Sequence, residues 1–258
     1  TVCHEFGMGM GLGSCRMILK DNQWLHDFDV RDIIGENLPL YANLGINQVE
    51  EIASSGNWHL ITELIKKLRA DGLIIHINPL QEWMQPEGDR LKHPPLDTLS
   101  RTIDKLPFTK LVVKEVGQGM GPESLKALLQ LPLEAIEFGA YGGTNFSRLE
   151  IIRNSQSRAA LQESLATVGH NAEEMVQIVN NAVKANLTIR TKHLIISGGI
   201  ASFLDGYYLT GISHLPAVYG QASAFLQYAR EGLDPLRAYT KAQTEGLRMA
   251  ASYLRIKK

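Results

Sequence analysis

Residues 193–201 read HLIISGGIA, and residues 217–223 read AVYGQAS. Each stretch joins a short apolar run to glycine. An apolar run of this length without polar alternation is typical of a parallel strand that is buried on both faces. Glycine directly after such a strand allows a tight turn into a helix and a close approach of the backbone to a ligand. The two stretches therefore predict two consecutive β-α units.

Similar apolar runs occur upstream, which gives seven predicted strands in all. They are Met8–Leu12, Leu40–Leu44, Leu73–Ile77, Leu111–Glu115, Ala135–Phe138, His193–Ser197 and Ala217–Tyr219. Amphipathic segments between them predict helices at Trp58–Ala70, Pro95–Leu106, Pro122–Leu131, Glu173–Ala185, Phe203–Thr210, Gln221–Glu231 and Pro235–Arg255. This alternation predicts a TIM (β/α)8 barrel, which has eight strands. We therefore expect one α/β domain over residues 1–258, with the first barrel strand missing from this chain.

The composition excludes several classes of protein. Lys and Arg number 26 against 27 Asp and Glu, so the net charge of −1 argues against a nucleic-acid interface and against a polybasic membrane anchor. No apolar run approaches the roughly 18–20 residues needed to span a bilayer. Two cysteines can form at most one disulfide bond, which is too few to stabilise a fold of 258 residues, so we expect them to be reduced thiols. These features predict a cytoplasmic protein.

Polar residues follow every predicted strand, at the barrel end where active sites of this fold lie. The clusters are Gly13–Arg16, Asn43 with Gly45, His76–Asn78 with Gln81 and Glu82, Lys114–Glu115, Gly142–Asn145, Ser197–Gly199 and Gly220–Ser223. The loops Ser197–Ala201 and Gly220–Ser223 would follow barrel strands seven and eight, where such proteins often bind phosphate. They predict a phosphate cup, although a tight strand-to-helix turn would also explain the glycine pair.

The third cluster indicates a site for a hard cation. His76 and Asn78 are two residues apart on one strand and share a face, and Glu82 is close enough in sequence to bind Mg²⁺ through oxygen. A hydrogen-bonded histidine without other function is the alternative. Lys114 suggests a positioned cation, with a Schiff-base lysine and a structural lysine as alternatives. The polar segment Gln85–Arg90 predicts either a lid or a solvated turn.

The motifs together resemble the type 2, FMN-dependent isopentenyl-diphosphate delta-isomerases. The matching stretches are GLGSCR (Gly11–Arg16), YANLG (Tyr41–Gly45), HINPLQEWMQPEGDR (His76–Arg90), VKEVGQG (Val113–Gly119), GGTNF (Gly142–Phe146) and SGGI (Ser197–Ile200). The stretch from His76 to Arg90 is the specific part, because the glycine motifs alone fit many flavin or phosphate barrels.

The resemblance implies an FMN-binding TIM barrel that interconverts isopentenyl diphosphate and dimethylallyl diphosphate. It also implies reduced FMN, with NADPH as the reductant, Mg²⁺ on the diphosphate, and a homo-oligomer, either a tetramer or an octamer. Two alternatives stay open. One is another FMN barrel, such as an oxidase or dehydrogenase of 2-hydroxy acids, and the other is a non-catalytic flavin-binding remnant.

The resemblance also assigns residues to roles. Gln81, His76 and Asn78 are the implied catalytic residues, and Glu82 is the implied metal ligand. The implied substrate contacts are Ser14, Cys15, Arg16 and Gln81. The implied FMN contacts are Ser14, Asn43, Lys114, Thr144, Gly199, Ile200, Ala201, Ala222 and Ser223.

The chain departs from the family pattern in ways that predict a divergent subfamily. The N-terminal part of the family, about its first quarter, has no counterpart here. Gly139-Ala140 replaces a Ser-Gly pair, Ala201 replaces an arginine, and Val168-Gly169-His170 replaces a Trp-Gly segment. The loop with Ala201 is therefore the part of the phosphate cup that we expect to differ.

Overall fold

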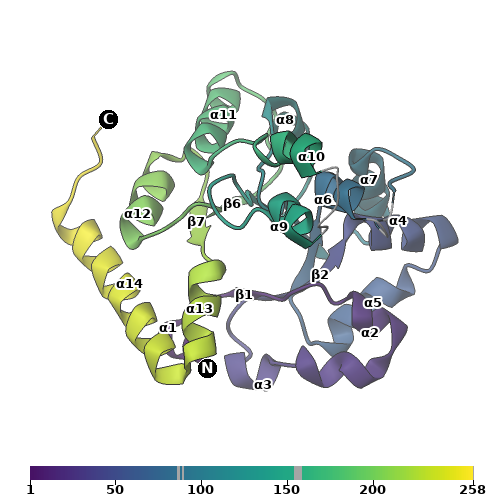
Figure 1. Ribbon diagram of the computed structural model, residues 1–258, viewed down its shortest axis with the longest axis horizontal. Helices are drawn as coiled ribbons and strands as arrows, with labels where there is room; N and C mark the ends of the chain where they lie inside the picture. The colour runs from purple at the N-terminus through teal and green to yellow at the C-terminus, as the bar shows by residue number, and fades with distance from the viewer. Residues whose placement is uncertain (86–87, 89, 154–158, 258) are drawn as a thin grey trace. The chain divides into compact units, whose positions relative to one another are not determined.

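A computed structural model describes residues 1–85, 88, 90–153 and 159–257 of the chain (Figure 1). The chain divides into two compact units. The first unit comprises Thr1–Trp83 and Glu87–Lys114, and the second comprises Met84–Pro86 and Glu115–Lys258. The single domain over residues 1–258 stays a prediction.

Two further expectations concern the loops and the membrane. Pro86, Glu87 and Asp89 of the predicted lid lie outside the described residues. Within the described parts of the chain, no helix combines the length and the apolar character needed to cross a bilayer.

The first unit holds four parallel strands, β1 (Met10–Gly11), β2 (Leu40–Gly45), β3 (Gly72–His76) and β4 (Lys110–Lys114). Leu73, Ile74 and Ile75 are all buried, as expected of a strand covered on both faces. In the register of the sheet, Gly45 pairs with His76 and His76 pairs with Lys114. The carboxyl ends of three strands therefore lie in one row.

The helices of the first unit cover these strands. They are α1 (Val2–Phe6), α2 (Arg16–Lys20), the 3-10 helix η1 (Asn22–Asp27), α3 (Arg31–Ile34), α4 (Ile46–Ser55), α5 (His59–Lys67), most of α6 (Pro79–Met84) and α7 (Pro95–Lys105). Ile61 and Leu64 on α5 and Leu99 on α7 are buried, which places the apolar stripe of each helix in the core.

The second unit holds three parallel strands, β5 (Ala135–Glu137), β6 (His193–Ser197) and β7 (Ala217–Gly220). Its helices are α8 (Pro122–Leu129), α9 (Phe146–Arg153), α10 (Ala159–Ala166), α11 (Ala172–Lys184), α12 (Phe203–Ile212), α13 (Ser223–Glu231) and α14 (Leu233–Tyr253). The long helix α14 runs past α12 and α13 (Figure 1). Gly246 on α14 allows this packing, because a Cβ there would collide with the ring of Phe203.

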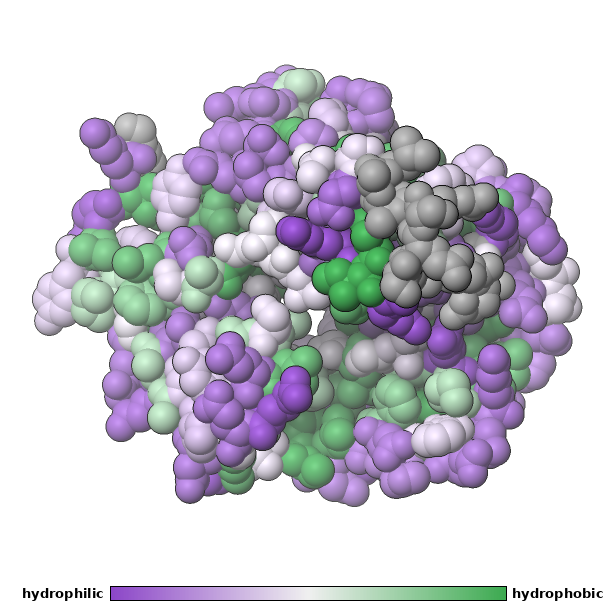
Figure 2. All heavy atoms as spheres, in the orientation of Figure 1, coloured by the Kyte–Doolittle hydropathy of each residue, from purple (hydrophilic) through white to green (hydrophobic). Residues whose placement is uncertain are grey.

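Helix α9 buries polar as well as apolar residues. It buries Ser147 and Glu150 beside Ile151, whereas Phe146, Leu149 and Ile152 are exposed. Figure 2 shows hydrophobic side chains gathered over this helix. Ile151 packs with Met84 and Ala166, so the apolar contact of this helix is small, and its buried carboxylate needs polar partners.

All seven predicted strands are confirmed within a residue or two of their expected bounds. Their succession with intervening helices is that of a (β/α)8 barrel from which one strand is absent, which confirms the fold class. One expectation was wrong for two of the strands. Neither β1 nor β7 is buried on both faces, because both residues of β1 are exposed and Val218 in β7 is 60% exposed.

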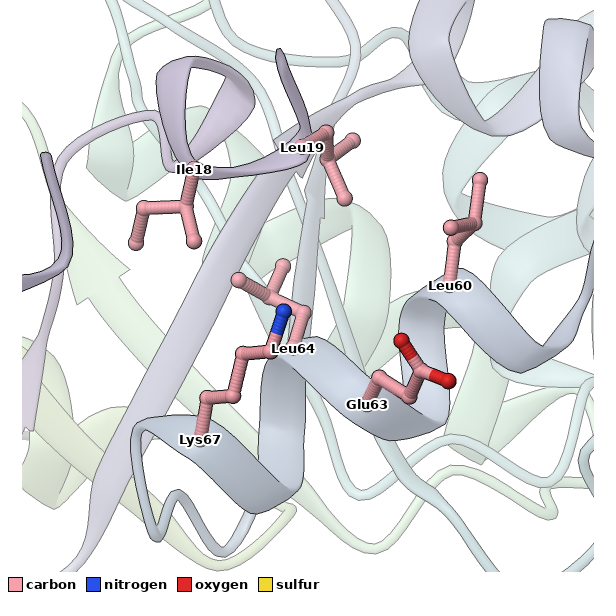
Figure 3. Close-up of a pocket in the computed structure, with 6 residues that line it drawn as sticks. All are labelled: Ile18, Leu19, Leu60, Glu63, Leu64 and Lys67. Atoms are coloured by element: carbon pink, nitrogen blue, oxygen red, sulfur yellow. The ribbon is translucent and has the colours of Figure 1, made fainter. Parts of the chain in front are cut away.

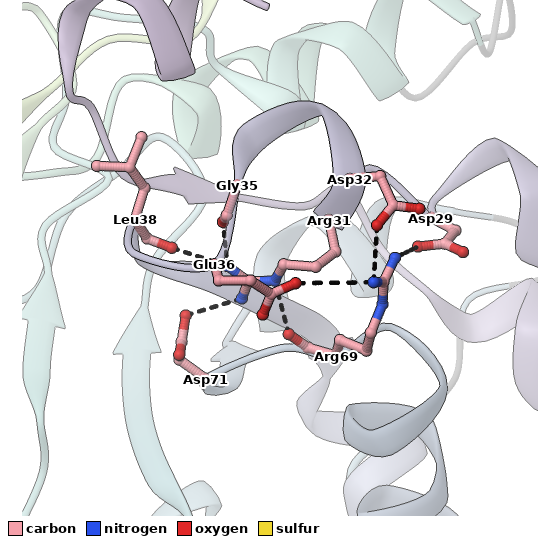
Figure 4. Close-up of polar contacts among 8 residues, drawn as sticks. All are labelled: Asp29, Arg31, Asp32, Gly35, Glu36, Leu38, Arg69 and Asp71. Carbon is pink, nitrogen blue, oxygen red and sulfur yellow. Dashed lines mark hydrogen bonds and ion pairs between the residues drawn. The ribbon is translucent and has the colours of Figure 1, made fainter.

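A buried arginine ties the amino-terminal ends of β2 and β3 together (Figure 4). Arg31 is 1% exposed and donates hydrogen bonds to the carbonyl oxygens of Arg69, Gly35 and Leu38, at 2.8–2.9 Å. It also donates to the carboxylate of Asp71 at 2.9 Å. Burial alone would raise the pKa of Asp71, but the backbone N–H of residue 40 and the Arg31 guanidinium hold it below its usual value.

We expect Arg31→Met to lower the free energy of unfolding by about 3–5 kcal/mol, because the variant leaves buried carbonyl oxygens and a carboxylate without their donor. Urea denaturation followed by tryptophan fluorescence measures this, since Trp24, Trp58 and Trp83 all lie in the first unit. The control is Arg69→Met, which removes only exposed ion pairs and should cost less than about 1 kcal/mol. If the two variants lost the same free energy of unfolding, the conclusion that Arg31 holds the ends of β2 and β3 together would be wrong.

Candidate functional site

Polar side chains of the first unit gather where β2, β3 and β4 end, and we call them the strand-end cluster. Its members are Ser14, Arg16, Asn43, His76, Asn78, Gln81, Glu82 and Lys114. The row Gly45, His76 and Lys114 brings three of the strand ends into register. Seven of the residues predicted to bind flavin, substrate or metal therefore lie in one compact unit with His76.

Asn43 is the hub of this cluster. It is 6% exposed, its Nδ2 donates to the carbonyl oxygen of Leu12 at 2.9 Å, and its Oδ1 lies 2.8 Å from His76 Nδ1. Because the amide nitrogen faces Leu12, the amide oxygen must accept from the ring, so this network assigns the proton of neutral His76 to Nδ1. The Nε2 atom of His76 is then an acceptor.

The His76 ring is held in its neutral form. Burial lowers its pKa to about 4, with smaller contributions from the positive charges of Lys114 and Arg16. The same two cations make the electrostatic potential around the ring positive, which disfavours a third positive charge and favours an anionic ligand. The neutral ring suits hydrogen bonding rather than donation of a proton from an imidazolium.

Gly45 keeps the space beside His76 open. It is the last residue of β2, and its backbone N–H donates to Gln48 Oε1 at 3.1 Å. A Cβ at this position would lie 2.9 Å from His76 Nε2. A side chain at position 45 would therefore have to displace the ends of the Gln48 and His76 side chains, which favours glycine for a steric reason.

Asn78 connects the end of β3 to helix α6. Its Nδ2 donates to Gln81 Oε1 at 3.1 Å and to Glu82 Oε1 at 3.0 Å. Its Oδ1 is buried and has no hydrogen-bond partner, and the same is true of Ser14 Oγ. Buried polar atoms are normally paired, so these two atoms are suited to partners that a ligand supplies.

The donor set suits a magnesium ion that is shared with a phosphate substrate. Mg²⁺ usually takes one or two protein carboxylates and completes its shell with water and phosphate oxygens. Glu82 supplies one carboxylate, next to the amide of Asn78. Among the described residues there is no cluster of three His, Cys, Asp or Glu side chains that would hold a metal without a substrate.

Cys15 and Arg16, at the start of α2, are placed differently from each other. Cys15 is fully buried, its Sγ donates to the carbonyl oxygen of Gly13 at 3.4 Å, and burial raises its pKa to about 11. The structure therefore does not present this thiol to a substrate. Arg16 is exposed at the start of α2, and its charge reaches His76.

In the second unit, the two predicted phosphate loops are both present. Gly198 and Gly199 have φ values of 88° and 72°, which favour glycine. Helix α13 begins after Ala222 with no side chain capping its first N–H groups, and Ser223 is exposed there. Such an uncapped helix start is suited to an anion. Thr144, also exposed, follows a glycine that packs against the Gly198–Gly199 turn.

Ala201 does not offer its N–H group to an anion. The Asp205 carboxylate accepts from Ala201 N at 3.0 Å and from Ser202 N at 2.8 Å, and so caps helix α12. The open part of the cup is therefore reduced to Gly199, Ile200, Ala222 and Ser223. A cavity of about 320 Å³ opens beside it, lined by Tyr141, Gly142, Asn171, Ala172, Glu173, Gly198, Gly199, Ile200, Asp205, Tyr208 and Leu209.

A second cavity, between α2 and α5 in the first unit, is not a candidate site. Figure 3 shows the six residues that line it: Ile18, Leu19, Leu60, Glu63, Leu64 and Lys67. Its volume of about 40 Å³ has room for a water molecule or two rather than a substrate.

The sequence analysis did not foresee the contacts of two carboxylates, the half-buried Glu115 of the Lys114–Glu115 cluster and the buried Glu150. Glu115 Oε2 accepts from the backbone N–H groups of residues 117, 118 and 119 at 2.6–2.9 Å, so it shapes that loop, and burial raises its pKa. Glu150, on the inward face of α9, accepts from Gln85 Nε2 at 2.7 Å. No pattern in the sequence indicates that Glu150 is buried, because its neighbours Leu149 and Ile152 are apolar and yet exposed.

Parallel strands that alternate with helices and end in polar clusters define the class of this protein, a (β/α)8-type fold with binding groups at the carboxyl ends of its strands. No protein-family model matches the chain. It is similar, however, to several proteins named isopentenyl-diphosphate delta-isomerase, which confirms the resemblance inferred from its motifs.

Three of these relatives show the extent of the similarity. The Rickettsia akari (strain Hartford) protein is 30% identical over 229 residues, which are 88% of this chain and 63% of the relative. The Chlorobium phaeobacteroides protein is 30% identical over 209 residues, 78% and 56% of the two chains. The Ignicoccus hospitalis protein is 32% identical over 243 residues, 93% and 65%. The chain thus spans about three-fifths of the length of these relatives.

We expect His76 to be neutral at pH 7 and to take up a proton only near pH 4. The unfolded chain binds that proton at pH 6.5 and below, so His76 should lower stability by about 1.4 kcal/mol per pH unit as the pH falls from 6.5 toward 4. NMR titration of the ring, assigned by the loss of its resonance in His76→Gln, measures the pKa directly. Protonation of the folded protein above pH 6 would contradict the neutral assignment.

Proposed function

We propose that this chain carries the activity for which its relatives are named, the interconversion of isopentenyl diphosphate and dimethylallyl diphosphate. One observation supports it above the others. The buried, unpartnered Oδ1 of Asn78 lies on the residue that hydrogen-bonds Gln81 and Glu82, within the most specific motif of the sequence. That arrangement suits a diphosphate with its magnesium ion.

The first unit supplies the electrostatics for the diphosphate. Arg16 and Lys114 lower the pKa of the His76 ring, so their charges act in the same small region. Glu82 would bind Mg²⁺, and the metal would neutralise further phosphate charge. A chain with a net charge of −1 can bind an anion in this way because the positive charge is local.

The uncharged members of the cluster would orient the substrate. His76 is neutral and fixed by Asn43, so it offers Nε2 as an acceptor and does not act as the principal acid. Gln81 is hydrogen-bonded to Asn78 and would align the isoprenoid chain. Apolar strands beneath the cluster exclude water, which protects a carbocation-like state.

FMN is the cofactor that this proposal requires, in its reduced form and with NADPH as the reductant. When bound, reduced FMN supplies a group that can exchange protons with the substrate without net redox change. The unpaired Oγ of Ser14 suits a flavin contact, and Asn43, Lys114 and Thr144 are the other contacts we propose. The glycines and the uncapped α13 of the second unit suit the FMN phosphate.

The assembly and the location of the protein belong to the same proposal. We expect a homo-oligomer, a tetramer or an octamer, in the cytoplasm. Neither a nucleic acid nor a membrane is an expected partner, since the charged residues balance.

We expect the protein, incubated anaerobically with FMN, NADPH and Mg²⁺, to convert isopentenyl diphosphate to its dimethylallyl isomer. Glu82→Gln should lower the rate at least about 100-fold, because the variant removes the only proposed protein carboxylate on the metal. The matched control is Glu51→Gln, an exposed position on α4, which should keep the wild-type rate. Product is measured by chromatography of the dephosphorylated alcohols.

Other outcomes of this assay discriminate the alternatives. A folded, flavin-loaded protein that gives no isomer refutes the isomerase. Flavin reduction by a 2-hydroxy acid would instead indicate the oxidoreductase, and flavin binding without either reaction would indicate a non-catalytic remnant.

A further inference from the structure

Gln221 joins the two phosphate loops of the second unit to the last helix. It lies between β7 and α13, where its Nε2 donates to the carbonyl oxygen of Ile200 at 2.9 Å. Its Oε1 accepts from the hydroxyl of Tyr239 on α14 at 3.1 Å. The amide nitrogen and the amide oxygen of Gln221 are therefore both hydrogen-bonded. The Ile200 carbonyl and the Tyr239 hydroxyl together fix the orientation of the amide.

Tyr239 is itself held firmly. Its ring stacks on Tyr228 with the centroids 4.4 Å apart, and it meets Phe225 edge-on at 5.4 Å. Both rings belong to α13, so the aromatic group binds α13 to α14. The hydroxyl that reaches Gln221 is thus presented from a fixed position.

The same helix α14 also supports the second loop. Its Gly246 lies against the ring of Phe203, the first residue of α12. Helices α12 and α13 begin at the two phosphate loops, and α14 contacts both of them. The spacing of the two loops therefore depends on α14, and Gln221 is the hydrogen-bonded link between that helix and the loop of Ile200.

We propose that Gln221 is a positioning residue that holds the two loops at the spacing an anionic phosphate group needs, and that Tyr239 fixes its orientation. The inference rests on the proposed binding of FMN. The hydrogen bond from Gln221 Nε2 to the Ile200 carbonyl oxygen has two effects. It fixes the orientation of the peptide group between Ile200 and Ala201. It also pairs a carbonyl oxygen whose partial negative charge would otherwise repel a phosphate. Gln221 itself need not touch the ligand.

The test compares FMN with riboflavin, which lacks the phosphate, by quenching of flavin fluorescence. Gln221→Met keeps the length of the side chain and removes both hydrogen bonds. We expect it to weaken FMN binding about tenfold, because it leaves the Ile200 carbonyl without its donor, and to change riboflavin binding less than about twofold. The control is Gln227→Met, at an exposed position of α13.

The role of Tyr239 is tested by a double-mutant cycle. Tyr239→Phe should weaken FMN binding less than Gln221→Met does, and the double variant should be no weaker than Gln221→Met alone, because the two residues act through one link. Tyr253→Phe, at an exposed position of the same helix, is the control. Additive losses in the double variant would overturn the role of Tyr239.

Two results would overturn the role of Gln221: unchanged FMN binding in Gln221→Met, or equal losses for FMN and riboflavin, which would indicate a general disturbance of the fold. Failure of the proposed function gives a different result. Wild-type protein that binds FMN no more tightly than riboflavin has no phosphate cup, and both the cup and its positioning residue are then refuted.

Discussion

The hydrogen bond between Asn43 and His76 is the interaction on which the strand-end cluster depends. It crosses from β2 to β3 at their carboxyl ends, and the bond from Asn43 to the Leu12 carbonyl extends it to the chain just after β1. Because an amide has one donor side and one acceptor side, this single side chain sets the tautomer of the ring. The parallel register then places Lys114 beside it. Backbone pairing thus determines the electrostatics of the cluster.

The two units offer different kinds of group that suit an anion. The first has side-chain cations, Arg16 and Lys114, next to a histidine that burial keeps neutral. The second has glycine turns and an uncapped start of α13, with the carboxylate of Asp205 on the neighbouring turn. Side-chain cations attract an anion by charge, whereas backbone N–H groups favour one of a particular shape. A nearly neutral protein can therefore offer both kinds of group without a basic surface.

The sequence located the strands well because a short apolar run is a local property, although the burial on both faces that such a run suggests fails for β1 and β7. It also placed Asn43, His76, Asn78 and Lys114 at strand ends, since strand ends follow from strand bounds. Helix α4 was missed because β2 passes into it directly at Gly45, without a loop to mark the change. The burial of Cys15 and the capping of α12 by Asp205 depend on side-chain direction, which a sequence pattern does not specify. Those features arise from tertiary packing.

Position 45 shows how a residue without a side chain can shape the strand-end cluster. A methyl group there would occupy the space beside the acceptor nitrogen of His76. The β2 strand could still pair with β3, so the fold would tolerate the change better than the chemistry. A substitution at this position would thus change ligand binding more than the amount of folded protein. Space that is left empty can therefore affect ligand binding as directly as a side chain does.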